Sequence, residues 1–132
     1  MFSDIPSVRA ELDARLREVL PAKWKVEKDI EAPDATLTPA VYIEFRRIGS
    51  TFDGQPLPHG VLAAEVQLIL TDPRTDRAGE GDVEDHLVNL IAALDPHEDL
   101  AWTTAEKQRV ERTGSWSWAL TLFAFVDITI KE

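Results

Sequence analysis

The chain has 132 residues with 44% hydrophobic and 29% charged content, values that fit one globular domain spanning residues 1–132. It contains no cysteine, which excludes a disulfide framework, a thiolate metal site and a cysteine nucleophile. Its formal net charge of −10 argues against a protein that wraps nucleic acid, because phosphates require Lys and Arg. The simplest interpretation of the acidic balance is a surface that keeps the protein soluble.

Neither a secretory signal nor a membrane span is predicted. Residues 1–4 lack the basic region with which a secretory signal begins. The longest apolar run, 116–126, is interrupted by Ser117 and Thr121 and is shorter than the roughly 20 residues that cross a bilayer.

The first predicted element is an amphipathic helix that ends at Pro21. Ser3 or Asp4 supplies its N-cap, and Pro6 is tolerated in the first turn because its missing N–H would have no helical partner there. The apolar stripe recurs at steps of three and four residues and comprises Ile5, Val8, Leu12, Leu16, Val19 and Leu20.

Three strands are predicted after this helix. Residues 24–28 alternate weakly and indicate a short strand, whereas two prolines place residues 31–39 in a loop. Residues 41–48 and 61–70 alternate more clearly between apolar and polar side chains, which predicts two strands with one buried face each.

The connection 49–60 between these two strands is longer than the roughly 2–5 residues that are typical of a hairpin. Asp53-Gly54 is a hairpin-type turn signal, and Pro56 and Pro58 stiffen the returning limb. Such a loop is either functional or an idle surface connection, and the residues alone leave both interpretations open.

A second helix is predicted to begin near Asp76 or Asp82 and to end at Leu94, before Asp95-Pro96. Gly79 and Gly81 weaken its first turn. Its buried stripe consists of Val83, Leu87, Leu90, Ile91 and Leu94.

The last third of the chain predicts two antiparallel strands, 100–112 and 116–130, joined by a turn at 113–115. Phe123 and Phe125 make the reverse face of the last strand apolar, so we expect it to lie centrally and to be covered on both sides. The resulting order is α-β-β-β-α-β-β. The predicted fold class is α+β, with a mostly antiparallel sheet packed against two helices.

No catalytic, cofactor-binding or metal-ligating set emerges, and the chain is not predicted to be an enzyme. Gly79-Glu80-Gly81 carries a carboxylate that would repel a phosphate. His59, His86 and His97 show no metal-ligand spacing and are expected to be solvated surface residues.

The carboxylates and serines carry little chemistry either. Glu44 and Glu65 could face each other across neighbouring strands, although like charges there more often point to solvent or to a partner's arginine. Ser50, Ser115 and Ser117 lack a nucleophile-elbow sequence.

The tryptophans admit two interpretations. Trp102, Trp116 and Trp118 fall on the last two predicted strands, where they either form a packing cluster or line a small-molecule pocket. Packing is the favoured interpretation. Trp24 fits the packing cluster and the pocket equally well. The pocket would make the chain a small-molecule-binding domain or an enzyme, which is the alternative function.

The order of elements resembles that of the tail terminator, or tail completion, proteins of long-tailed bacteriophages. The resemblance covers nearly the whole chain. It rests on the opening helix, the 41–48 strand, the loop with Asp53-Gly54, the strand ending at Leu68–Asp72, the 83–94 helix and the closing 116–130 strand.

The resemblance implies a structural virion protein that forms a homo-oligomer, a hexameric ring, at the head-proximal end of the tail tube. Such a ring stops tube growth and joins the tail tube protein to the head–tail connector protein. It would be part of the virion tail, assembled in the host cytoplasm, with no cofactor and no membrane contact. A neighbouring neck adaptor of the head–tail joint shares most of these features.

The resemblance also implies roles for the loop and for the acidic balance. Genome DNA would pass the ring without specific binding, because carboxylates lining the bore repel phosphates. By analogy with extended loops that reach a neighbouring ring, Phe52 and Leu57 would be apolar anchors. The expected partner interface comprises Thr51, Phe52, Asp53, Gly54, Gln55 and Leu57.

Overall fold

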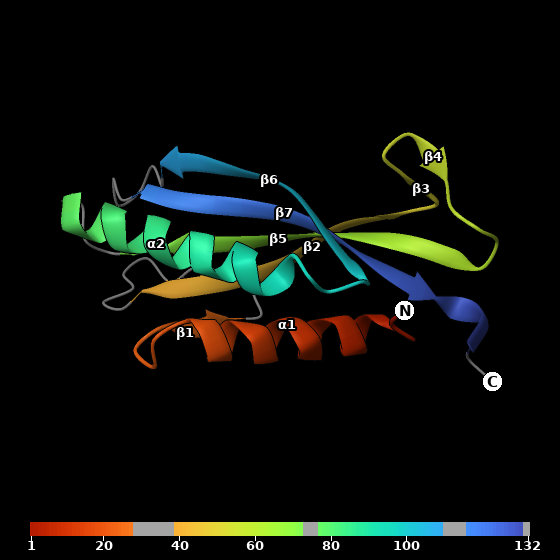
Figure 1. The fold of residues 1–132 in the computed structure, drawn as a ribbon, viewed down its shortest axis with the longest axis horizontal. Helices are drawn as coiled ribbons and strands as arrows, with labels where there is room; N and C mark the ends of the chain where they lie inside the picture. The colour runs from red at the N-terminus through yellow and green to blue at the C-terminus, as the bar shows by residue number, and fades with distance from the viewer. Residues whose placement is uncertain (28–38, 73–76, 110–115, 131–132) are drawn as a thin grey trace.

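The computed structural model of the chain describes residues 1–27, 39–72, 77–109 and 116–130. These residues form two α-helices, one five-stranded sheet and a two-stranded hairpin near one end of the sheet (Figure 1). In chain order the elements are α1 (Ile5–Val19), β1 (Lys25–Glu27), β2 (Ala40–Gly49), β3 (Thr51–Phe52), β4 (Gln55–Pro56), β5 (Val61–Thr71), α2 (Arg77–Leu94), β6 (Leu100–Arg109), β7 (Trp116–Asp127) and a 3-10 helix (Ile128–Ile130).

The sheet has the strand order β1-β2-β5-β7-β6. β1 pairs with β2 in parallel, and the other three pairings are antiparallel. The predicted α+β class and the predicted order of the main elements are therefore confirmed. The short strands β3 and β4 were not predicted. They pair as a hairpin within the long connection between β2 and β5.

Helix α1 forms as its sequence predicts. Asp4 is the N-cap, and its Oδ1 accepts hydrogen bonds from the backbone N–H of Ser7 at 2.8 Å and from the Ser7 hydroxyl at 2.5 Å. Pro6 lies in the first turn, where no intrahelical donor is lost.

Both helices cover the same face of the sheet. The apolar stripes of α1 and α2 pack on alternate residues of β5 and β7, because side chains on a strand point to opposite faces with a period of two. We call this the helix face and the opposite one the outer face. The largest fully buried side chains include Leu12, Leu16, Leu68, Leu70, Leu90, Leu120 and Leu122.

The last strand is shorter than predicted. β7 ends at Asp127, and residues 128–130 turn into a 3-10 helix in which Ile128 is 53% exposed. The reason is the partner strand: β5 begins at Val61, which lies opposite Asp127, so β5 offers nothing for residues 128–130 to pair with. The apolar alternation continues in the sequence, but the sheet does not.

β7 lies between β5 and β6, so the prediction of an interior strand is confirmed, although β5 is the middle strand. The predicted loop at 31–39, apart from Pro39, and the predicted turn at 113–115 lie outside the described residues. Within the described part of the chain, neither helix combines the length and the apolar composition needed to cross a membrane.

Candidate functional site

The 49–60 connection folds into a hairpin, which we call the arm and define as residues 51–58. Thr51 pairs with Pro56 and Phe52 with Gln55. Asp53 and Gly54 both have positive φ, 52° and 75°, which are the left-handed conformations of a type I′ turn. The turn predicted at Asp53-Gly54 is thus confirmed, and Figure 1 shows the arm standing clear of both helices.

Phe52 attaches the arm to the sheet of its own chain. Its ring centroid lies 5.2 Å from that of Phe123 and 5.1 Å from that of Phe125, both in edge-on geometry. These two phenylalanines lie on the outer face of β7, so the arm covers part of the apolar reverse face noted in the sequence. The backbone N–H of Leu57 closes the base of the arm with a 2.9 Å hydrogen bond to the Ser50 carbonyl.

The rest of the arm faces solvent. Thr51, Asp53, Gly54 and Gln55 are exposed, and Leu57 is half-buried. Four of the six predicted interface residues, those of the turn and the residues beside it, therefore lie at the exposed tip of the arm. Phe52 lies under the arm rather than on its free surface.

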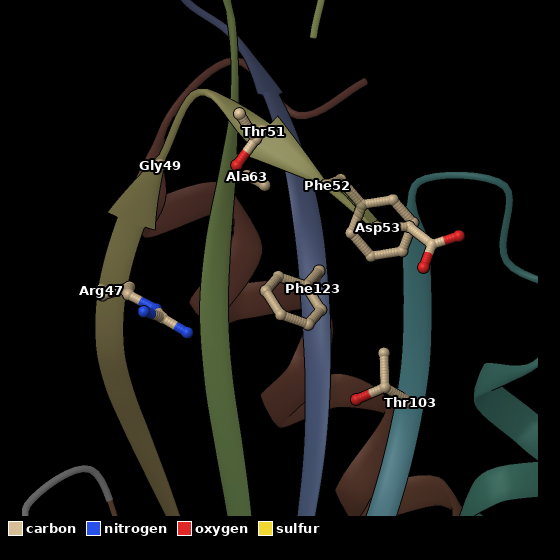
Figure 2. Close-up of a pocket in the computed structure, with 8 residues that line it drawn as sticks. All are labelled: Arg47, Gly49, Thr51, Phe52, Asp53, Ala63, Thr103 and Phe123. Atoms are coloured by element: carbon tan, nitrogen blue, oxygen red, sulfur yellow. The ribbon is translucent and has the colours of Figure 1, made fainter. Parts of the chain in front are cut away.

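A hollow of about 390 Å³ lies beneath the arm on the outer face (Figure 2). Figure 2 shows Phe52 and Phe123 on its apolar side, with Arg47 on β2 and Thr103 on β6 at opposite borders. Its lining comprises Arg47, Gly49, Thr51, Phe52, Asp53, Ala63, Thr103 and Phe123, without a tryptophan.

A β-bulge sets the charges beside this hollow. The register of β2 shifts between Phe45 and Arg47, so that Arg47 instead of Arg46 lies opposite Glu65. The Arg47 guanidinium donates to Glu65 Oε1 through Nε at 3.2 Å and through Nη2 at 3.0 Å. The possibility that Glu44 faces Glu65 is wrong, because Glu44 lies opposite Gln67.

The base of the arm is joined to the C-terminal turn. The Gly60 carbonyl accepts a hydrogen bond from the Ile128 N–H at 2.9 Å. The carboxylate of Asp127 accepts from the Thr129 hydroxyl at 2.5 Å and from the Thr129 N–H at 2.9 Å. These hydrogen bonds, the one from the hydroxyl above all, lower the pKa of Asp127.

Trp118 packs against the core, as the favoured interpretation expected, but it does not lie beside Trp102. Trp102 lies opposite Leu122 and Lys107 opposite Trp118, so the two indole-bearing positions are four residues, or about 13 Å, apart along β7. Trp24 is buried in the core, whereas the Trp116 side chain lies outside the described residues. The register of β6 therefore separates side chains that the sequence suggested were neighbours.

Two of the three histidines pack against aromatic rings, which corrects the expectation that all three are solvated. His86 meets Trp24 edge-on at 5.5 Å, and His97 stacks on Phe2 at 5.6 Å. His59 is exposed. Among the described residues, no three His, Asp or Glu side chains gather as metal ligands would.

No family model matches the sequence, and no curated protein matches it. Among solved structures, the fold is similar to the sheath/tube terminator of an extracellular contractile injection system, PVC, in its extended state. The TM-score is 0.50 at 16% sequence identity, and the match covers 96% of this chain. The chain spans 58% of the length of that protein. A likeness at this identity establishes a shared fold.

Proposed function

We propose that this chain is a structural protein of the tail-terminator type, which assembles as a ring on the end of a tail tube and stops its growth. The observation that carries the proposal is the similarity of 96% of the chain to a protein that is itself a sheath/tube terminator. The sequence resemblance to phage tail terminators points to the same class from the order of the elements alone.

The arm is the proposed contact with a neighbouring ring or tube subunit. Its tip, Thr51 and Asp53 to Gln55, is exposed at the end of the sheet. The Phe52 contacts with β7 hold this tip in one orientation, so little conformational entropy remains to be lost on docking. Leu57, half-buried at the base, would close the contact.

The ring is proposed to be a hexamer at the head-proximal end of a phage tail, joined on its other side to the head–tail connector. The net charge of −10 supports a bore through which DNA passes without binding, because carboxylates repel phosphates. At physiological salt this repulsion acts over about 8 Å, so only carboxylates lining the bore take part.

The proposal is tested by polymerising the tube protein of the same tail system with and without this chain. Electron microscopy should then show a ring on one end of each tube and shorter tubes as the chain is added. Tubes of unchanged length without terminal rings would overturn the proposal.

The arm is tested in the same assay with the variant Thr51→Ala/Gln55→Ala, which alters two exposed side chains of the tip and leaves the Asp53-Gly54 turn intact. It should retain the fold and lose tube capping. The matched control, Asp85→Ala/Asn89→Ala, alters two exposed side chains of α2 and should cap tubes as the unmodified chain does. Equal capping by both variants would remove the arm from the contact.

A further inference from the structure

Among the described residues, both outer edges of the sheet are open over much of their length. β1 pairs with β2 only as far as Tyr42, and among the described residues no strand lies beside β2 from Ile43 to Gly49. β6 forms the other border, with β7 on one side only (Figure 1). Open edges carry unpaired backbone N–H and C=O groups, which pair readily with another chain.

The two open edges lie at the same level of the sheet and run in opposite directions. The registers through β5 and β7 place Ile43 level with Ala105 and Phe45 level with Trp102. Ile48 is level with Leu100. A second copy set sideways against the first would therefore bring β6 alongside β2 as an antiparallel partner, without a shift along the strands.

Exposed apolar side chains mark both edges at this level. Ile48 is 58% exposed on β2 and Trp102 is 38% exposed on β6, and both lie on the helix face. The Trp102 indole N–H donates to Asp95 Oδ1 at 2.9 Å, which fixes the ring in one orientation. A large, oriented and partly exposed indole is a typical interface anchor.

A groove on the β2 side offers space for this ring. A hollow of about 440 Å³ lies along α1 and is lined by Ile5, Pro6, Arg9, Ala10 and Asp13. The Arg9 guanidinium lies 4.6 Å from the centroid of the Phe45 ring, which places β2 at the same groove. No described carboxylate forms an ion pair with Arg9, although the chain carries 24 Asp and Glu residues.

The two edges also differ in charge. On the β2 edge Arg46 and Arg47 already pair with Glu44 and Glu65 of the same chain, whereas Arg9 beside it forms no ion pair with a described carboxylate. The segment leading into β6 carries the exposed Asp95 and Glu98. A copy that joins β2 to β6 with its Trp102 in the groove thus brings Asp95, which accepts from that indole, toward Arg9, whereas β2 against β2 would bring the Arg9 side chains of both copies together.

We propose that a second copy of this chain docks with its β6 edge against the β2 edge, and that its Trp102 enters the groove between α1 and β2. There the indole meets Phe45, which is level with it, and Ile48, its diagonal neighbour. The inference rests on the proposed ring and names the contact that builds it. Because the contact joins two different surfaces head to tail, repetition can close a ring.

The bulges in both strands restrict where the two edges can pair. β2 is irregular between Phe45 and Arg47, and β6 between Trp102 and Thr104. Bulges on edge strands prevent indiscriminate pairing. The two bulges lie at neighbouring positions along the strand direction. When β6 of one copy lies alongside β2 of another, the irregular part of each strand therefore faces the irregular part of the other.

Introduced cysteines test the geometry, since the chain has none of its own. Glu44 and Thr104 are level across the sheet, so Glu44→Cys/Thr104→Cys should form a disulfide ladder between copies that ends in a closed ring and disappears on reduction. The control Thr104→Cys/Val88→Cys moves one thiol to α2, where Val88 is 64% exposed, and should give no ladder. Equal cross-linking of both variants, or of neither, would overturn the edge contact.

Substitutions test the anchor. Trp102→Ala and Ile48→Asp should each weaken ring formation by more than about tenfold in sizing and mass measurements, since buried aromatic anchors carry most of an interface. Val88→Asp, on the exposed surface of α2, should leave it unchanged. Rings that survive both edge substitutions would refute this contact and leave the proposed function standing. An unmodified chain that stays monomeric on assembled tubes would refute both.

Discussion

Replacement of Phe52 by alanine tests whether the arm is held by its own sheet. Phe52 makes two edge-on aromatic contacts, with Phe123 at 5.2 Å and with Phe125 at 5.1 Å. A half-buried phenylalanine gains roughly 1 kcal/mol from burial, and each such ring pair adds about 0.5–1.5 kcal/mol. Phe52→Ala should therefore lower the free energy of unfolding by about 2–4 kcal/mol.

Denaturant unfolding measures this loss, and hydrogen exchange locates it. The Leu57 amide, which bonds to the Ser50 carbonyl at 2.9 Å, should exchange faster in Phe52→Ala. Gln55→Ala, an exposed change in the same arm, should alter stability by less than about 0.5 kcal/mol. If Phe52→Ala unfolds like Gln55→Ala and leaves the Leu57 amide protected, the arm is not held by this ring.

Three further changes test the base of the arm and the core. Gly60→Ala should cost about 1–3 kcal/mol by thermal unfolding, because φ is +86° and the new Cβ would lie 2.2 Å from the Thr129 methyl. Asp127→Asn should lower the melting temperature at neutral pH. Since folding lowers the Asp127 pKa, this stabilisation is present above the ordinary value of 3.8 and disappears as the pH falls through the lower folded value. Leu120→Ala, at a side chain with 0% exposure, should cost about 2–5 kcal/mol in denaturant.

For each of these three predictions, one outcome would contradict the physical reason given. Gly60→Ala with unchanged stability would mean that the turn can relax away from Thr129. A melting difference between the unmodified chain and Asp127→Asn that persists in strong acid would show that the Thr129 hydrogen bonds are not responsible. A loss below about 1 kcal/mol for Leu120→Ala would contradict its place in the packed core.

The helices and the core were predictable because each pattern depends only on local spacing. The stripe of α1, with Leu12 and Leu16 fully buried, follows from steps of three and four residues. The Asp53-Gly54 turn followed from the preference of these residues for positive φ. In both cases the physical cause lies within a few residues of the chain.

The predictions that were wrong concern positions where the register or the length of a strand depends on the strand beside it. One extra residue at the β2 bulge brought Arg47 opposite Glu65, which strict alternation could not anticipate. The alternation at Ile128 continued past the point where β5 supplies a partner. The separation of Trp102 from Trp118 likewise depends on the pairing of β6 with β7.

The candidate site was only partly predictable for the same reason. The loop and its turn could be found from proline and glycine positions, whereas the interface expected at the exposed tip stays a prediction. The packing of Phe52 on Phe123 and Phe125 could not be predicted from the sequence, because it joins residues about seventy positions apart in the chain.

The mass of the particle that this 14.8 kDa chain forms, alone and on tubes, decides whether the chain assembles as a ring. A closed ring seated on the tube end should have a mass that is a whole multiple of the chain mass, six for the proposed hexamer. A particle of one chain mass, in solution and in the presence of assembled tubes alike, would contradict it.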